Sequence, residues 1–101
     1  MSISSKRKEL IRQQHPLYGQ EVIEVTHIQD RFLNGSDEDD NLRPLTRPQH
    51  LADHVSKAER SEEWDVARRQ YGAARLIAKR MTPDETEEAN QLLAQMPKPR
   101  K

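Results

Sequence analysis

Two histidines four residues apart come closest to a metal site in this sequence. His50 and His54 lie on either side of Asp53 in the segment HLADH, and on a helix both imidazoles would share one face. Two imidazoles at this spacing can bind one metal ion. A zinc site needs a third ligand, however, and no general base stands beside the pair. We therefore predict two surface histidines, one of which could touch Trp64, and no metal site.

Three basic residues in the segment 62–80 could bind phosphate groups. Arg68, Arg75 and Lys79 fall within one stripe of an expected helix, at the border of its apolar face. Together with the basic N-terminus and the basic C-terminal tail, they would form a patch for non-specific nucleic-acid binding. The acidic run 84–88 could instead neutralise them, and solvation or an acidic partner protein are further alternatives. The formal net charge of zero argues against a basic field over the whole molecule.

No other motif points to catalysis. The acidic run DEDD at 37–40 lacks the spaced ligands and the terminal Glu of a calcium loop, so we expect a flexible loop. The chain has no Cys and three Gly, and it contains no phosphate-cradling glycine loop, nucleophile elbow or cofactor fingerprint. We expect a protein that is not an enzyme and that has no cofactor.

The size and composition allow only a small core. The chain has 101 residues, of which 33% are hydrophobic and 34% are charged. A core of that size rarely provides more than roughly 3–5 kcal/mol of stability, so a partner or a dimer interface would help it. No apolar run matches a signal peptide or a membrane span, and we expect a soluble, cytoplasmic protein.

The N-terminal third is predicted to be an extension of the main fold. A basic segment at 1–14 would hold a short helix over 4–14, and an extended segment with the acidic loop would follow at 15–45. In 20–28, the β-branched residues of QEVIEVTHI favour a strand, although the apolar spacing through Phe32 also fits a helix that ends at Asn34 and Gly35. The strand could pair with a second strand near 41–45, or with the sheet of a partner or of a second copy.

The segment 46–96 is predicted to be a helical domain, which makes the fold mainly α. Capping patterns at Thr46, near Ser61 and at Thr82 mark three helix starts, although one bent helix over 47–80 is an alternative to the first two. The helices would form a small three-helix unit, a hairpin plus a C-terminal helix, followed by a disordered tail at 97–101.

The segment 62–80 has the clearest apolar face. Its large and small apolar residues recur at spacings of three and four. These residues are Trp64, Ala67, Tyr71, Ala74 and Ala78. Val66, Ala73 and Ile77 widen the face to nearly half the circumference. We expect Trp64 and Tyr71 in the core, so that Trp64→Ala would cost roughly 3–5 kcal/mol and unfold the domain.

The hairpin resembles a single tetratricopeptide-type repeat over about 35 residues. The resemblance rests on the pattern W-x2-A-x3-Y-x2-A, which begins at Trp64, together with a first helix that carries Leu51 and Ala58. The chain departs from the repeat at Val55, where a small residue is usual, and at Ser61, which replaces the turn glycine. The same residues are similar to those of short bacterial regulators of the ANR type. Plain packing of two helices, with alanines opposite aromatics, is the alternative.

These features predict a small interaction module, an adaptor or regulator of bacterial or phage type that binds another protein or itself. Tyr18, Ile23 and Phe32 are the candidate contact residues of the N-terminal third, since they are apolar and lie outside the helical domain. The alternative is a nucleic-acid-associated accessory protein that uses the basic stripe and the basic tails. The two functions differ in their dependence on salt, because phosphate binding weakens steeply as salt rises.

Overall fold

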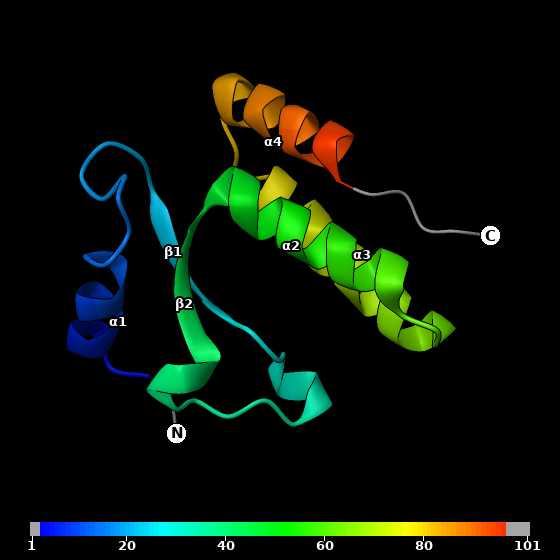
Figure 1. Cartoon of the computed structure of the whole chain (residues 1–101), viewed down its shortest axis with the longest axis horizontal. Coiled ribbons are helices and arrows are strands. Elements are labelled where there is room, and N and C mark those ends of the chain that lie inside the picture. Colours follow the sequence, from blue (N-terminus) through cyan, green and yellow to red (C-terminus); the bar gives the residue numbers. More distant parts are fainter. Residues whose placement is uncertain (1–2, 97–101) are drawn as a thin grey trace. The chain divides into compact units, whose positions relative to one another are not determined.

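The structure is a computed structural model that describes residues 3–96 (Figure 1). The chain divides into two compact units, Met1–Thr46 and Arg47–Lys101. Within the described residues the fold is mainly α, with a short helix and a β-hairpin in the first unit and three packed helices in the second, as the sequence predicts. The predicted disordered tail at 97–101 lies outside the described residues.

The first unit is built on a two-stranded antiparallel sheet. Strand β1 (Ile23–His27) pairs with strand β2 (Leu42–Thr46), and in their register Ile23 faces Thr46 and His27 faces Leu42. The strand prediction for 20–28 is therefore confirmed over a shorter range, and the helical alternative is wrong. The partner strand comes from this chain, close to the predicted 41–45, because the loop between them folds back on itself.

Helix α1 (Ser5–Arg12) packs against both strands of this sheet. The Ser4 hydroxyl accepts a hydrogen bond from the backbone N–H of Arg7 at 3.2 Å and so caps the helix. Of its two large apolar residues, Ile11 is buried and Leu10 is exposed. Ile11 is thus the apolar contact of this short, mostly polar helix, and Arg12 adds a hydrogen bond of 3.1 Å to the carbonyl oxygen of Ile23 on β1.

The second unit consists of helices α2 (Arg47–Arg60), α3 (Trp64–Ala78) and α4 (Pro83–Gln95). Helix α2 packs against α3 in an antiparallel hairpin and also against α4 (Figure 1). The alternative of one bent helix over 47–80 is wrong, because the chain turns at residues 61–63. There the Ser61 hydroxyl accepts from the N–H of Glu63 and donates to its carbonyl oxygen, so α3 begins at Trp64, later than the predicted cap at Ser61.

Local cap chemistry sets the start of α4. The Thr82 hydroxyl accepts from the N–H of Glu85 at 3.2 Å, and the Glu85 carboxylate accepts from the N–H of Thr82 at 2.9 Å. Pro83 occupies the first turn, where its missing N–H costs no hydrogen bond. The predicted capping box is confirmed in full.

The core of the second unit joins all three helices. It consists of buried Leu51, Ala74, Ile77 and Ala89, with partly buried Val55, Met81 and Leu93 packed against them. The small side chains let the helices approach closely, and Ile77, only 2% exposed, provides much of the apolar volume. No helix of the described residues is long and apolar enough to cross a membrane.

The predicted orientation of α3 is wrong. Its buried face consists of Ala67, Gln70, Ala74 and Ile77. Trp64 keeps 72% of its surface exposed, and Tyr71 keeps 37%. The apolar residues spread over nearly half of the circumference of the helix, so either the face with Trp64 or the face with Ile77 could pack into the core. In the structure the face with Ile77 and Gln70 is the buried one.

Candidate functional site

The outer face of α3 carries a row of exposed large side chains, which we call the α3 stripe. Its members follow one another at steps of four, three, four and four residues, the spacing that puts side chains on one face of a helix. They are Trp64, Arg68, Tyr71, Arg75 and Lys79, and all five are exposed. Aromatic and cationic groups therefore alternate along the face that the fold leaves open.

A buried polar contact fixes the rotation of α3 that exposes this stripe. Gln70 is only 1% exposed, and its Oε1 lies 2.6 Å from Nδ1 of His54, which is itself buried on α2. The second ring nitrogen of His54 lies 3.1 Å from Nε2 of His50, one turn earlier. Buried polar groups need such partners, so rotating Gln70 out of the interface would lose a hydrogen bond inside it.

The prediction of two surface histidines is thus wrong for His54. Its side chain holds the helix pair together, and its neighbour His50 is half-buried beside it. Across residues 3–96, no three His, Asp or Glu side chains gather in a group that could hold a metal ion.

The cations of the α3 stripe have no ion pair among the contacts of the described residues. Arg68, Arg75 and Lys79 all project into solvent, and a shallow hollow of about 420 Å³ is lined by Asp65, Arg68 and Arg69. In the acidic run 84–88, which the sequence left as one possible partner of these cations, Glu85 instead closes the cap of α4 and lies 3.2 Å from Arg47. The Glu85 carboxylate therefore links α2 and α4.

The structure separates the three contact residues predicted for the N-terminal third. Ile23 is 6% exposed and belongs to the core under α1, so we leave it out of any contact surface. Tyr18 is 43% exposed and precedes β1, whereas Phe32 is 39% exposed and lies after β1 in a short 3-10 helix, η1 (Arg31–Leu33). The Tyr18 hydroxyl donates to the Glu9 carboxylate, and this hydrogen bond raises the pKa of Tyr18.

The acidic loop between the strands is held by a network that sequence reasoning missed. Arg31 donates two hydrogen bonds to the Asp37 carboxylate, at 2.9 and 2.8 Å, and Nε2 of His27 lies 2.8 Å from the same group. These contacts, first from Arg31 and then from His27, lower the pKa of Asp37 to about 2. Arg7 donates to Asp39 at 2.7 Å and to the carbonyl oxygen of Asp37. Two carboxylates of the run, Asp37 and Asp39, are thus paired with basic side chains, contacts that the expectation of a flexible loop did not include.

A second short 3-10 helix, η2 (Asp39–Asn41), ends the loop, and Gly35 lets it close. The Asn41 side chain donates to the carbonyl oxygens of Gln29 and Ser36 and accepts from the N–H of Gln29. A side chain at Gly35 would place its Cβ 1.7 Å from the Gln29 carbonyl oxygen, so only glycine fits here.

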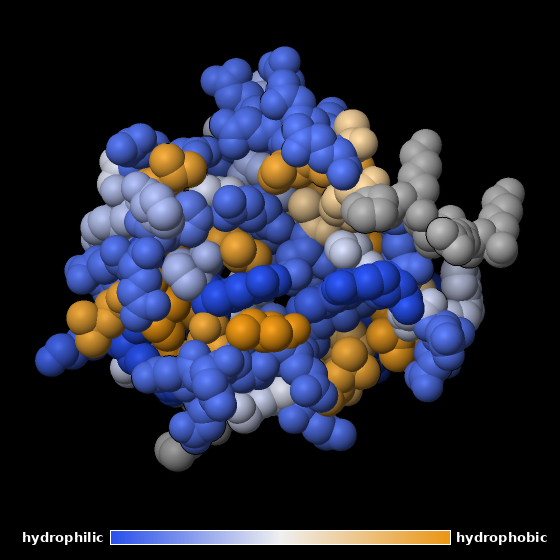
Figure 2. Space-filling model, in the orientation of Figure 1, coloured by the Kyte–Doolittle hydropathy of each residue, from blue (hydrophilic) through white to orange (hydrophobic). Residues whose placement is uncertain are grey.

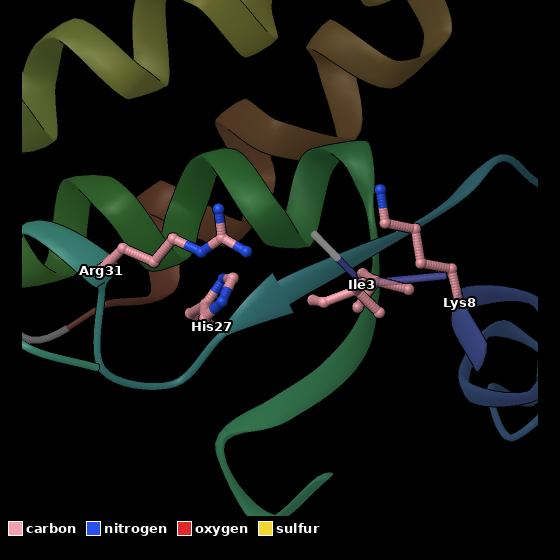
Figure 3. Close-up of a pocket in the computed structure, with 5 residues that line it drawn as sticks. Ile3, Lys8, His27 and Arg31 are labelled. Carbon is pink, nitrogen blue, oxygen red and sulfur yellow. The ribbon is translucent and has the colours of Figure 1, made fainter. Parts of the chain in front are cut away.

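A small pocket of the first unit lies beside this network (Figure 3). It has a volume of about 220 Å³ and is lined by Ile3, Lys8, Val25, His27 and Arg31. Figure 3 shows Arg31 and His27 on one side, with Ile3 and Lys8 across from them. Its cations could attract an anion, but Asp37 already occupies both Arg31 and His27. The pocket is therefore a weaker candidate than the α3 stripe.

Apolar side chains form small patches between charged ones on the face in view in Figure 2. Single exposed apolar residues are normal on a protein surface. The α3 stripe differs because two aromatic rings and three cations recur at helical spacing on one face.

No protein-family model, curated protein or solved structure matches this chain. The helical hairpin of α2 and α3 is present. The resemblance to a tetratricopeptide-type repeat or to ANR-type regulators stays a prediction. Of its motif, Ala67 and Ala74 are buried, whereas Trp64 and Tyr71 keep 72% and 37% of their surface exposed.

Proposed function

We propose that this protein is a non-catalytic protein–protein interaction module, an adaptor or regulator that acts in the cytoplasm, and that the α3 stripe is its contact surface. The observation that carries the proposal is the 72% exposure of Trp64, on a helix that packs into the core through other residues, Ile77 among them. A tryptophan that keeps most of its surface exposed in the monomer is well placed to be buried against a partner.

The residue types of the stripe support contact with a protein. Trp, Tyr and Arg are the residues enriched among those that contribute most to protein–protein binding. The stripe combines Trp64 and Tyr71 with Arg68 and Arg75, and Lys79 ends it. A helix or extended segment of a partner could cover the rings and leave the cationic heads at the rim.

Tyr18 and Phe32 are secondary candidates for contact. Both rings are exposed, but the Tyr18 hydroxyl is engaged with Glu9 and each ring lies in a different segment beside β1. We therefore give them a supporting role in the same proposal.

One observation favours a second function, association with nucleic acid. Proteins that bind single-stranded nucleic acids stack the bases on aromatic rings and neutralise the phosphates with basic side chains. The α3 stripe presents both kinds of group. A salt titration separates the functions, because phosphate binding falls steeply as salt rises whereas an apolar contact changes little.

Site-specific photocrosslinking in the native cells tests the proposal. Gly72 borders the stripe, and a Cβ built there meets no atom within 4 Å, so the position has open space for a photoreactive side chain. Asn90, exposed on α4, provides the matched control.

The proposal expects a discrete protein adduct from position 72 that disappears when Trp64→Ala is added and that is absent from position 90. Equal adducts from both positions, or no adduct from position 72, would refute it. An adduct with nucleic acid in place of protein would establish the second function.

A further inference from the structure

We infer that the partner of the α3 stripe is an acidic amphipathic helix, whose apolar residues cover Trp64 and Tyr71 and whose carboxylates pair with Arg68 and Arg75. This inference rests on the proposed function and adds the chemistry of the partner.

The length and spacing of the stripe fit a helical partner. From Trp64 to Lys79 the stripe extends about 22 Å, at 1.5 Å per residue. Its steps of three and four residues match the ridges along which one helix packs on another. Helices that dock in this way use anchors at the same spacing, so each exposed ring of α3 can meet an apolar residue of the partner.

The charges of the stripe call for acidic residues in the partner. Arg68 and Arg75 flank Tyr71 on both sides, and neither has an ion pair among the contacts of the described residues. A carboxylate placed beside the ring would reach one guanidinium, and the arginine fork can hold it with two hydrogen bonds. A basic partner would meet repulsion at the same positions.

The same charges disfavour nucleic acid as the occupant. Glu62, Glu63 and Asp65 are exposed around Trp64, at the N-terminal end of the stripe. A phosphate backbone that followed the stripe would meet these carboxylates before it reached the cations. A helix with an apolar end and an acidic remainder avoids them.

Trp64 reports directly on this binding, because it is the only tryptophan of the chain and is 72% exposed. The probe is a synthetic helical peptide without tryptophan, with leucines at three- and four-residue steps along one face and glutamates beside them except at one end, which is left apolar. Two matched peptides replace every Glu by Gln or by Lys, and a single-stranded oligothymidylate represents nucleic acid. Emission of the full chain is recorded as each probe is added.

We expect the Glu peptide to shift the Trp64 emission to shorter wavelength, as burial of the ring removes water from it. Arg68→Ala or Arg75→Ala should weaken this binding about tenfold, the effect of losing one strong interface contact of ~1.4 kcal/mol. Lys6→Ala removes an exposed cation of α1 and should leave the affinity unchanged.

The results separate failure of the inference from failure of the proposed function. If the Gln peptide binds as tightly as the Glu peptide, or if the arginine variants bind normally, the acidic partner is wrong and the contact surface stands. If oligothymidylate alone shifts the emission, both the inference and the proposed function are wrong. If no probe shifts it, the inference is wrong, and the crosslinking experiment decides the proposed function.

Discussion

Replacing Trp64 and Ile77 by alanine, one at a time, tests which face of α3 lies in the core and which is exposed. Ile77 is 2% exposed and lies in the core with Leu51, Ala74 and Ala89. Removing a buried Ile side chain costs about 2–5 kcal/mol, through lost burial and the cavity left behind. A small core of this kind provides roughly 3–5 kcal/mol in total, so Ile77→Ala should leave the helical unit largely unfolded.

Trp64→Ala should have a much smaller effect. With 72% of its surface exposed, the ring hides about a quarter of the ~200 Å² that a fully buried aromatic removes from water. That area corresponds to about 1.3 kcal/mol at 25 cal/mol/Å², and it is an upper bound because the unfolded chain also covers part of the ring. Alanine recovers about 0.5 kcal/mol of helix propensity. We therefore expect a net loss below about 1 kcal/mol.

Urea denaturation followed by circular dichroism measures both variants, since helix content does not depend on the tryptophan signal. The expected result is a midpoint close to wild type for Trp64→Ala and a large loss for Ile77→Ala. If Trp64→Ala lost as much stability as Ile77→Ala, the ring would be part of the core, and the assignment of the two faces of α3 would be refuted.

Three further predictions concern contacts that hold each unit together. Gln70→Ala should lower the free energy of unfolding by about 1–3 kcal/mol, because it removes the buried hydrogen-bond acceptor of His54. In a His54→Ala background the same substitution should cost far less, as a double-mutant cycle would measure. Equal costs in the two backgrounds would contradict the contact. Gly35→Ala should destabilise the first unit by forcing its loop open, whereas Gly72→Ala on α3 should stabilise the second unit by about 0.5–1 kcal/mol. Amide hydrogen exchange measures the stability of each unit. A Gly35→Ala variant as stable as wild type would contradict the loop structure. The neighbours of Asp37 hold its pKa at about 2, below the ordinary 3.8, so the stability that it contributes should be complete above pH 3.8 and disappear as the pH falls through 2. The free energies of unfolding of wild type and Asp37→Asn, measured in urea, should therefore differ at neutral pH and converge in acid. A difference that stayed constant with pH would be the contrary result.

Local chemistry is what the sequence predicted best. The capping box of α4 depends on residues three positions apart, Thr82 and Glu85, and the break before α3 depends on the turn around Ser61. The β-branched residues of β1 likewise favour a strand without help from the rest of the chain. Such features need no knowledge of which segments meet in space.

The rotation of α3 could not be predicted in the same way. Apolar residues cover nearly half of the helix, so the pattern alone does not choose between a face with Trp64 and a face with Ile77. The choice depends on the hydrogen bond between Gln70 and His54, whose two members lie 16 residues apart. A glutamine is usually exposed, so nothing in the sequence marks Gln70 as a buried residue.

The candidate site was therefore predicted only in part. Arg68, Arg75 and Lys79 were identified as an exposed basic stripe, and they do share one face of α3. The two aromatic residues of the same face, Trp64 and Tyr71, were assigned to the core, so the stripe was interpreted as a charge pattern without apolar anchors. In the acidic loop, the partners of Asp37 lie on β1 and η1, and only the folded hairpin brings them together.

The emission spectrum of Trp64 in the free 101-residue chain tests the central claim most directly, because this ring is its only tryptophan and forms one end of the α3 stripe. The structure predicts emission at the wavelength of tryptophan in water, with quenching by acrylamide close to that of the free amino acid. Emission shifted to shorter wavelength and protected from acrylamide would show a ring that is already buried, and would contradict an open binding face on α3.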